Sequence, residues 1–413
     1  MYKPYVISWN LTKRCNLKCS HCYLDAKALT AHDPNELDTQ EAKKIIDQIA
    51  SVNTQTILIL TGGEPFLRKD LLDLSHYASQ KELMVVIGTN GTLIDDNLAK
   101  EMVKIGIFGV GISLDSSGPE FHDSFRGYPG AWNKAMEGIE ICRKYDLPLQ
   151  IQATATKDNY KDIPNIMKMA HELGAKVFNL FFLVCTGRGQ DVSDITPSQY
   201  EEMLNLLVDS QGKFDGMMVR ARCAPHFKRI AYQKNPDSPM TKVKGYLGGG
   251  CLAGSHYCRI TPDGKITACP YLPTEVGDTR KTSFADIWRE NETFGQLRKM
   301  ELHGKCSNCE YELICSGCRA RAFADNGDMM GEDPWCEHNP EEGVEKILIP
   351  EEIKEKLQEA PEWTPEARNI LKKIPFFLHN LVIKGAESYA VKAGIKTITP
   401  EVMEEIKKKR GQV

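Results

Sequence analysis

The chain has little of three features that would tie it to a particular cellular surface. No apolar run among its 413 residues is long enough to cross a membrane, and residues 1–6 lack the apolar core of a signal peptide. The net charge is only −4, so no charge excess indicates binding to nucleic acid or to an anionic membrane surface. These absences predict a cytoplasmic protein that binds neither nucleic acid nor a membrane.

Cysteine, in contrast, is plentiful, with 14 residues. In a reducing compartment thiols in such number are more often metal ligands than disulfides, and metal–sulfur sites indicate an anaerobic or microaerobic setting. Length, composition and motif spacing predict several domains. We expect a core at 1–195, a bridging helix with loops at 196–245, a cysteine-rich domain at 246–340 and a helical module at 341–413.

The first domain alternates short apolar runs with segments of helical periodicity, which predicts an α/β fold with a parallel sheet, either open or a partial (β/α)6 barrel. In both forms ligands gather at the carboxyl ends of the strands. The expected strands are 6–11, 56–60, 84–89, 108–114, 149–156 and 177–184.

A CxxxCxxC run, Cys15, Cys19 and Cys22, follows the first expected strand. Three thiolates are one short of a closed zinc site but can hold three irons of a cubane cluster, leaving the fourth iron open. A zinc knuckle is the alternative. The run resembles the cluster loop of radical S-adenosylmethionine (SAM) enzymes, with His21 at a position that is usually aromatic.

A second motif, Gly62-Gly63-Glu64-Pro65, follows the second expected strand. It could be an ordinary strand-to-helix turn, but after a CxxxCxxC loop it resembles the radical-SAM motif that holds the methionine amino group. The resemblance covers residues 5–190 and implies reductive cleavage of SAM to a 5′-deoxyadenosyl radical.

Further SAM contacts are expected after the later strands. Ser113 and Asp115 suit a ribose, and Asn90 and Thr154 offer polar groups at neighbouring strand ends. The resemblance places Arg126 against the SAM carboxylate, with a surface arginine as the alternative.

Eight more cysteines lie between residues 251 and 336, enough for two four-cysteine zinc sites or two four-iron clusters. The pattern resembles the SPASM extension of radical-SAM enzymes, which carries two auxiliary 4Fe–4S clusters and brings the expected total to three. The family arrangement implies cluster I on Cys251, Cys258, Cys269 and Cys318, and cluster II on Cys306, Cys309, Cys315 and Cys336. Cys315 and Cys318 form CxxC where the family usually has CxxxC, which makes Cys318 the least certain of these ligands. Cys142, Cys185 and Cys223 are expected not to bind metal.

The composition changes after residue 340, from an acidic stretch at 341–366 to a basic one at 367–413. Pro365, Pro375 and Pro400 mark helix starts, including a helix over 376–393, and predict a three- or four-helix module. Segments beginning at Trp363 resemble the C-terminal domain of light-independent protochlorophyllide reductase subunits, which indicates a tetrapyrrole context. A docking module with a solvated basic face is the alternative.

The turn at 183–189 and the block at 306–322 resemble radical-SAM enzymes of haem and haem d1 biosynthesis. That resemblance implies hydrogen abstraction from a porphyrin propionate, loss of carbon dioxide and a reducing donor such as ferredoxin or flavodoxin. Arg188, Arg319 and Arg321 are candidate carboxylate ligands, although ion pairs with the protein's own acids would explain them equally well.

Two other functions stay open at this point. One is maturation of a peptide or of an enzyme cofactor, which is what most SPASM proteins do. The other is a non-catalytic iron–sulfur electron carrier, against which the SAM motifs argue. Roughly twelve irons per chain would fit three cubane clusters and exclude zinc in the auxiliary sites.

Overall fold

A computed structural model describes residues 2–26, 33–184, 186–192, 195–237, 250–341, 343–347, 361–371, 382–383, 385–387, 389–390 and 393–410. Cys185 and most of the expected helix over 376–393 lie outside these residues. In the described part no helix is long and apolar enough to cross a membrane.

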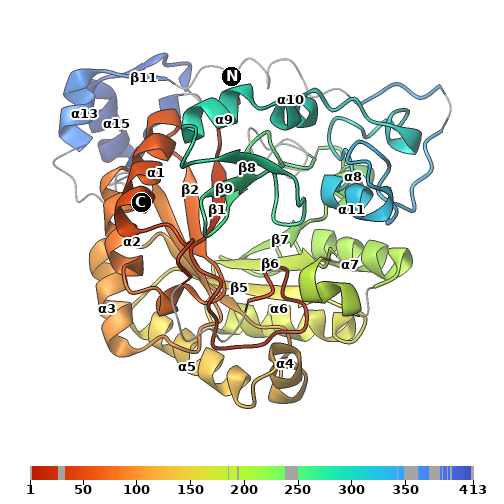
Figure 1. The fold of residues 1–413 in the computed structure, drawn as a ribbon. Helices are drawn as coiled ribbons and strands as arrows, with labels where there is room; N and C mark the ends of the chain where they lie inside the picture. Colours follow the sequence, from red (N-terminus) through yellow and green to blue (C-terminus); the bar gives the residue numbers. More distant parts are fainter. Residues whose placement is uncertain are drawn as a thin grey trace.

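The core is a partial barrel of parallel strands with helices on its outer face (Figure 1). Seven strands lie side by side in chain order, each hydrogen-bonded in parallel to the next. They are β1 (Val6–Asn10), β2 (Ile57–Thr61), β3 (Met84–Thr89), β4 (Gly109–Ser113), β5 (Leu149–Ala155), β6 (Val177–Phe182) and β7 (Met218–Arg222). The predicted α/β class and barrel are confirmed.

The crossover helices pack their apolar faces onto the sheet. They are α1 (Thr39–Val52), α2 (Leu71–Gln80), α3 (Asp96–Ile105), α4 (Pro119–Arg126), α5 (Ala131–Lys144), α6 (Ile163–Glu172), α7 (Pro197–Asp209) and α8 (His226–Lys234). The local sequence determines where several of these helices begin. Asp38 and Glu41 form a capping box on α1, and the Asp95 side chain caps α3.

The sheet is wider than six strands. Strand β7 lies in the region expected to be only a helix and loops, and the signal for it was the alternation Val219, Arg220, Ala221, Arg222. On the other side, β8 (Tyr257–Ile260) pairs in parallel with β1, and β9 (Lys265–Thr267) and β10 (Glu275–Asp278) continue the sheet as antiparallel strands. The cysteine-rich segment therefore begins as part of the barrel sheet.

The remaining α-helices and strands that the structure describes follow β10. They are α9 (Phe284–Glu290), α10 (Glu292–Lys299), α11 (Arg319–Asn326), β11 (Glu362–Trp363), α13 (Pro365–Leu371), β12 (Thr397–Ile398) and α15 (Pro400–Arg410).

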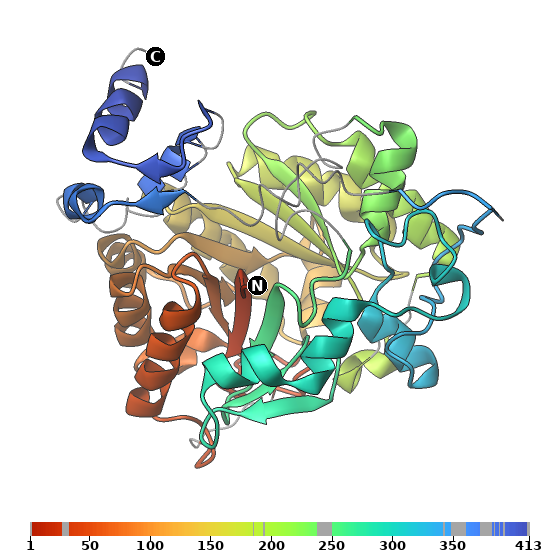
Figure 2. The same ribbon diagram turned by 90° about the horizontal axis from the view of Figure 1, so that it is seen from above.

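The C-terminal elements form a separate small core. Ala367, Ala386, Ala390, Ile398 and Met403 pack together beneath the short parallel pair β11–β12. This module and the segment that contains α11 lie on opposite sides of the barrel in both views (Figure 2). Gln55 Nε2, just before β2, donates to Glu387 Oε2 of this module at 2.7 Å.

Candidate active site

The first cysteine loop leaves β1 at the carboxyl edge of the sheet and is organised around its sulfur atoms. The backbone N–H groups of Leu17 and Ala26 each donate to a sulfur, Cys15 Sγ and Cys22 Sγ respectively, both at 3.4 Å. Burial, together with the negative charges of Cys19, Glu64 and Cys22, raises the pKa of Cys15 to about 12 against the opposing Leu17 hydrogen bond. Three thiolates crowded into an apolar pocket require a cation, so this donor set fits an iron–sulfur cluster.

Gly62 and Gly63 pack directly on that loop. Gly63 N–H donates to Thr12 O and Glu64 N–H to Arg14 O, both at 2.8 Å. A Cβ on Gly63 would lie 2.2 Å from Arg14 O, which no side chain tolerates. The close approach that the glycines permit in the structure is therefore to the cysteine loop itself.

Glu64 is a fully buried carboxylate at the end of β2. Thr89 Oγ1 donates to it at 2.8 Å, Asn90 N–H at 2.9 Å and Phe66 N–H at 3.2 Å. Burial nevertheless raises its pKa to about 7, and these hydrogen bonds oppose the rise. A carboxylate held in this way is suited to a ligand ammonium group, which would restore its charge.

His21 lies on the same loop and stacks on Phe125, with ring centroids 4.2 Å apart and planes within 6°. Burial, with the charge of Arg126 beside it, lowers its pKa to about 3, so the ring is neutral. Its Nδ1 atom is buried without a hydrogen-bond partner among the described residues. An orphaned ring nitrogen beside the cysteines fits a position that a bound cofactor completes.

Arg126 and Asp115 form a buried ion pair next to the cysteine loop. Arg126 Nε donates to Asp115 Oδ2 at 2.7 Å, and Arg126 Nη1 lies 3.8 Å from Cys19 Sγ. Thr154 N–H donates to Asp115 Oδ1 at 2.9 Å, so the structure brings three predicted SAM contacts together. Both charged side chains are buried, which excludes the surface-arginine alternative.

The other two predicted SAM contacts flank this pair. Asn90 Nδ2 donates to Asn16 Oδ1 at 2.8 Å and so ties the end of β3 to the cysteine loop. Ser113 is the last residue of β4 and is partly exposed. It lies two positions before Asp115 in the chain.

Arg188, predicted to bind substrate, instead clamps the cysteine loop. Its Nε donates to Cys19 O and its Nη1 to Ala26 O, each at 3.0 Å, and its backbone N–H donates to Cys22 O at 3.1 Å. These bonds favour a structural role, because the guanidinium group is already engaged with the loop carbonyls.

Arg319 and Arg321, the other two predicted substrate ligands, are buried on α11. Arg319 Nη1 donates to Met329 O at 3.1 Å and to Gly331 O at 2.8 Å. Arg321 pairs with buried Asp333 through Nε at 2.8 Å and Nη2 at 3.1 Å. The geometry favours the ion-pair alternative for Arg321, whereas Arg319 is engaged by backbone carbonyls; among the described residues Arg319 Nη2 and Arg321 Nη1 are buried without a hydrogen-bond partner.

The eight later cysteines separate into groups. Cys306, Cys309, Cys315 and Cys336 interact with one another: burial raises the pKa of Cys309 to about 11, and the charges of Cys336 and Cys306 add to the effect. The short CxxC loop closes through two left-handed residues, Ser316 (φ 57°) and Gly317 (φ 61°). These four thiols are the set expected for cluster II.

Cys251, Cys269 and Cys318 form the second group. Cys258, the expected fourth member, is not with them: it is buried on the opposite face of β8, so the structure does not support its assignment to cluster I. The alternation of side chains along a strand is the reason.

A tetrahedral zinc site would bring its sulfurs to within about 4 Å of one another. Among the described residues one group of candidate ligands, Cys309, Glu310 and His338, has its ligand atoms within 4.8 Å, and it contains a single sulfur. In the part of the chain that the structure describes, no three cysteine sulfurs are as close together as a tetrahedral zinc site requires.

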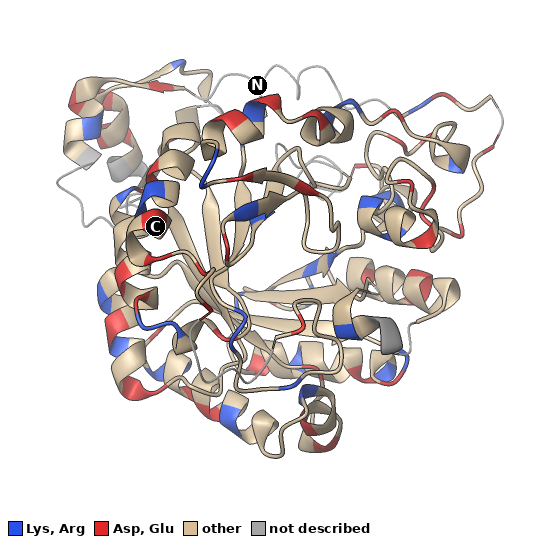
Figure 3. Cartoon of the chain, viewed as in Figure 1, with Lys and Arg blue, Asp and Glu red and all other residues tan. Residues whose placement is uncertain are grey.

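Sequence reasoning missed the polar inner face of the barrel. Arg259 on β8 donates from Nε to Asn10 Oδ1 at 2.6 Å and lies over the Tyr23 ring, 5.6 Å from its centroid. Arg222 on β7 donates from Nε to Asn179 Oδ1 at 2.9 Å. Figure 3 shows basic residues on β7, whereas strands β1 to β6 carry no charged residue. Polar residues at alternate strand positions were the available signal.

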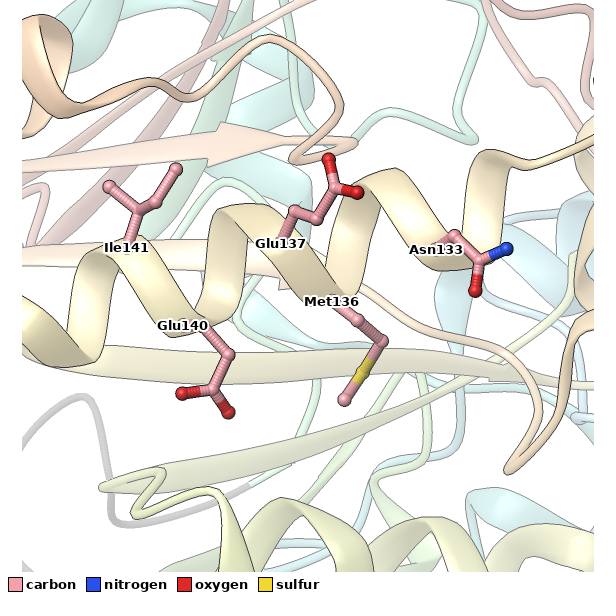
Figure 4. Close-up of a pocket in the computed structure, with 5 residues that line it drawn as sticks. All are labelled: Asn133, Met136, Glu137, Glu140 and Ile141. Atoms are coloured by element: carbon pink, nitrogen blue, oxygen red, sulfur yellow. The ribbon is translucent and has the colours of Figure 1, made fainter.

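A shallow depression on the outside of the barrel is a poor candidate site. Figure 4 shows that its lining residues, Asn133, Met136, Glu137, Glu140 and Ile141, all come from the single helix α5. They include no nucleophile and no cysteine.

Comparison with known proteins agrees with this geometry. The radical SAM superfamily model matches residues 9–170, the SPASM iron–sulfur cluster-binding domain matches 251–310, and the proto-chlorophyllide reductase 57 kD subunit family matches 363–407. The last match confirms the predicted resemblance of the C-terminal module.

Similar proteins include the AdoMet-dependent heme synthase of Methanosarcina barkeri, 41% identical over 82% of this chain and 97% of that protein. The pre-heme d1 synthase of Dinoroseobacter shibae is 30% identical over 81% of this chain and 86% of its own. Among solved structures, Streptococcus suis SuiB bound to S-adenosylmethionine has a TM-score of 0.66 at 18% identity, covering 82% of this chain and 78% of SuiB, and so shares the fold.

The cofactors are accordingly SAM and several iron–sulfur clusters of the 4Fe–4S type, as predicted. The first cysteine loop and the groups of later cysteines are thiol sets of the kind that such clusters need. The chain belongs to the radical SAM superfamily, among the enzymes that join a radical SAM core to a SPASM domain and that include the haem synthases.

Proposed function

We propose that the enzyme converts propionate side chains of an iron porphyrin to vinyl groups by oxidative decarboxylation, as the last chemistry of a haem-forming route. The observation that carries the proposal is the 41% identity to an AdoMet-dependent heme synthase along nearly its full length. A second relative from the same organism, an Fe-coproporphyrin III synthase at 32% identity, is named for a porphyrin with propionate side chains.

The inner face of the barrel supports a carboxylate-bearing substrate. Arg259 donates Nε to the neutral amide oxygen of Asn10 and Nη1 to Pro270 O, so neither of these partners neutralises its positive charge. Guanidinium groups pair with carboxylates in bidentate geometry, which suits porphyrin propionates. Arg259, rather than Arg319 and Arg321, is the proposed substrate ligand.

The chain's own residues hold the reactants. Cys15, Cys19 and Cys22 would hold the cluster, Glu64 would take the SAM ammonium group, and His21 would contact the cofactor beside the loop. When bound, SAM and the clusters supply a hydrogen-abstracting 5′-deoxyadenosyl radical and an acceptor for the electron that the substrate loses with carbon dioxide. Each propionate then loses one hydrogen atom, one carbon dioxide and one electron to become a vinyl group. A low-potential donor such as ferredoxin or flavodoxin would reduce the SAM cluster.

The test is anaerobic turnover of the reconstituted full chain with SAM, dithionite and iron-coproporphyrin III, followed by mass spectrometry. The proposal expects loss of two carboxyl groups together with formation of 5′-deoxyadenosine. Deoxyadenosine with unchanged porphyrin would overturn the substrate and leave the radical chemistry intact. In that case a peptide substrate is the next to test, because the mycofactocin maturase MftC of Mycolicibacterium smegmatis is 30% identical over 81% of this chain.

A further inference from the structure

Cys258 is turned away from the other cysteines of auxiliary cluster I. Along β8, Tyr257 and Arg259 are partly exposed, whereas Cys258 and Ile260 are fully buried on the opposite face. Cys258 aligns with Ile7 on β1, which is also fully buried. Because successive side chains of a strand point to opposite faces, Cys258 and Tyr257 cannot serve the same site.

The charged groups that act on Tyr257 differ from those that act on Cys258, and this difference indicates which face of β8 is turned toward auxiliary cluster I. Tyr257 interacts with Cys269 and Cys223, whereas the charged group that acts on Cys258 is Arg298 of α10, on the helix-covered side. Gly254, which begins the approach to β8, packs on Leu297 and Phe294 of the same helix. Cys258 therefore belongs to the packing between β8 and α10.

Cys223 occupies the position that Cys258 leaves vacant in the expected ligand set. Its neighbours by electrostatic interaction include Cys318 and Cys251, and Cys269 in turn interacts with Cys223, Cys318 and Cys251. The four thiols come from four different segments, and each is near enough to the other three to act on them electrostatically. The segments are the end of β7, the residues before β8, the turn after β9 and the start of α11.

Hydrogen bonds tie the backbone of Cys223 to that of Cys318. Arg321 Nη2 donates to Cys223 O at 3.1 Å and to Asp333 Oδ2 at 3.1 Å, and the same Asp333 oxygen accepts from Cys318 N–H at 2.8 Å. Cys223 itself has a left-handed backbone, φ +56°, which is uncommon for a residue with a Cβ. Such conformations persist where surrounding contacts hold them, and they concentrate at functional sites.

We propose that Cys223 is the fourth protein ligand of auxiliary cluster I, which is held by Cys223, Cys251, Cys269 and Cys318, and that Cys258 is a core thiol. Each of the four thiols gives up its proton as its sulfur binds one iron, so the cluster has no open iron. Because Cys223 follows β7, the cluster joins the last strand of the barrel to the cysteine-rich segment. The proposal does not depend on the substrate of the enzyme.

The experiment compares the variants Cys223→Ala and Cys258→Ala in the full chain, reconstituted anaerobically. Iron and sulfide are counted, and electron paramagnetic resonance (EPR) spectra of the reduced proteins are recorded with and without cyanide, which binds an open iron. The cyanide response of the parent, which comes from the open iron of its SAM cluster, is the reference for each variant. Cys142→Ala, which removes another fully buried thiol from α5, is the control for packing damage. Cys223→Ser is a milder second variant in case the alanine variant does not fold.

The proposal expects Cys258→Ala and Cys142→Ala to keep roughly twelve irons, as three cubanes require, with an EPR spectrum like that of the parent. Cys223→Ala should lose roughly four irons, or keep them with an altered spectrum that cyanide changes further. Cys223→Ser should alter the spectrum of one cluster in the same direction. Unchanged iron and spectra in the Cys223 variants would overturn the proposal, and so would loss of a cluster in folded Cys258→Ala.

Discussion

Arg126 and Asp115 form a buried ion pair, with Arg126 Nε donating to Asp115 Oδ2 at 2.7 Å beside the first cysteine loop. The arginine comes from the end of α4 and the aspartate from the residues after β4. Burial raises the pKa of Asp115, whereas the charge of Arg126 lowers it. The net result is a pKa below the usual value for an aspartate. The pair therefore contributes both to the stability of the barrel and to the geometry of the SAM site.

Replacing Asp115 with alanine is expected to leave the Arg126 charge buried without its partner. Breaking a buried pair in this way typically costs about 3–5 kcal/mol, measurable as a lower midpoint of denaturant unfolding. Asp73→Ala is the matched control, because its pair with Lys43 is exposed and such pairs contribute about 0–1 kcal/mol. Equal losses in the two variants would contradict the structural role of the buried pair.

Arg188→Ala tests whether this arginine clamps the cysteine loop or binds substrate. The clamp predicts a weakened SAM cluster, with iron falling from roughly twelve toward roughly eight per chain and the auxiliary clusters retained. Arg188→Lys should restore the lost iron only partly, since an ammonium group cannot reach two carbonyls as a guanidinium fork does. Full iron content with a raised KM for the porphyrin would instead restore the substrate-binding interpretation.

Glu64 should make the cofactor-free protein sensitive to pH. Its pKa in the folded chain is raised by burial to about 7, from 4.5, so the folded state holds this proton more tightly than the unfolded state. Stability is then greatest below pH 4.5 with respect to this group and is lost as pH rises toward 7, by up to about 3 kcal/mol.

Glu64→Gln should flatten that pH dependence of unfolding and also weaken SAM binding, since the amide carries no charge for the ammonium group. Glu140→Gln, on the exposed face of α5, serves as the control. Tight SAM binding by the Glu64 variant, measured by calorimetry under anaerobic conditions, would exclude the ammonium-binding role.

Arg259→Ala and Arg321→Ala should separate binding from structure. The first is expected to reduce iron-coproporphyrin affinity about tenfold or more with iron content unchanged, because a charge-assisted pair with a propionate is lost. The second leaves Asp333 buried and unpaired and should lower thermal stability sharply. Absorbance titration with the porphyrin and a thermal melt distinguish the two, and normal porphyrin affinity in Arg259→Ala would remove that residue from the substrate site.

The sequence alone was sufficient to predict the features that a short stretch of residues determines. The CxxxCxxC and GGEP motifs follow β1 and β2, and the β–α periodicity predicted the barrel, because strand and helix patterns are local and ligand-binding residues collect at strand ends. The SPASM cysteines and the C-terminal resemblance were equally visible from spacing and composition.

Tertiary structure decided what depends on pairing between distant segments. A thiol's spacing in the chain does not say which face of a strand it occupies, so Cys258 and Cys223 could be sorted only when β8 was paired with β1 and β7 was placed as a strand. Distance along the chain also matters for two of the arginines: Arg188 is bound by carbonyls 162 and 169 residues away, and Arg259 bonds to Asn10 across the sheet. The Nη1 partners of Arg319 and the Asp333 partner of Arg321 are only 10 to 12 residues away. Sequence sets the chemistry available at each position, and the register of the sheet determines which groups meet.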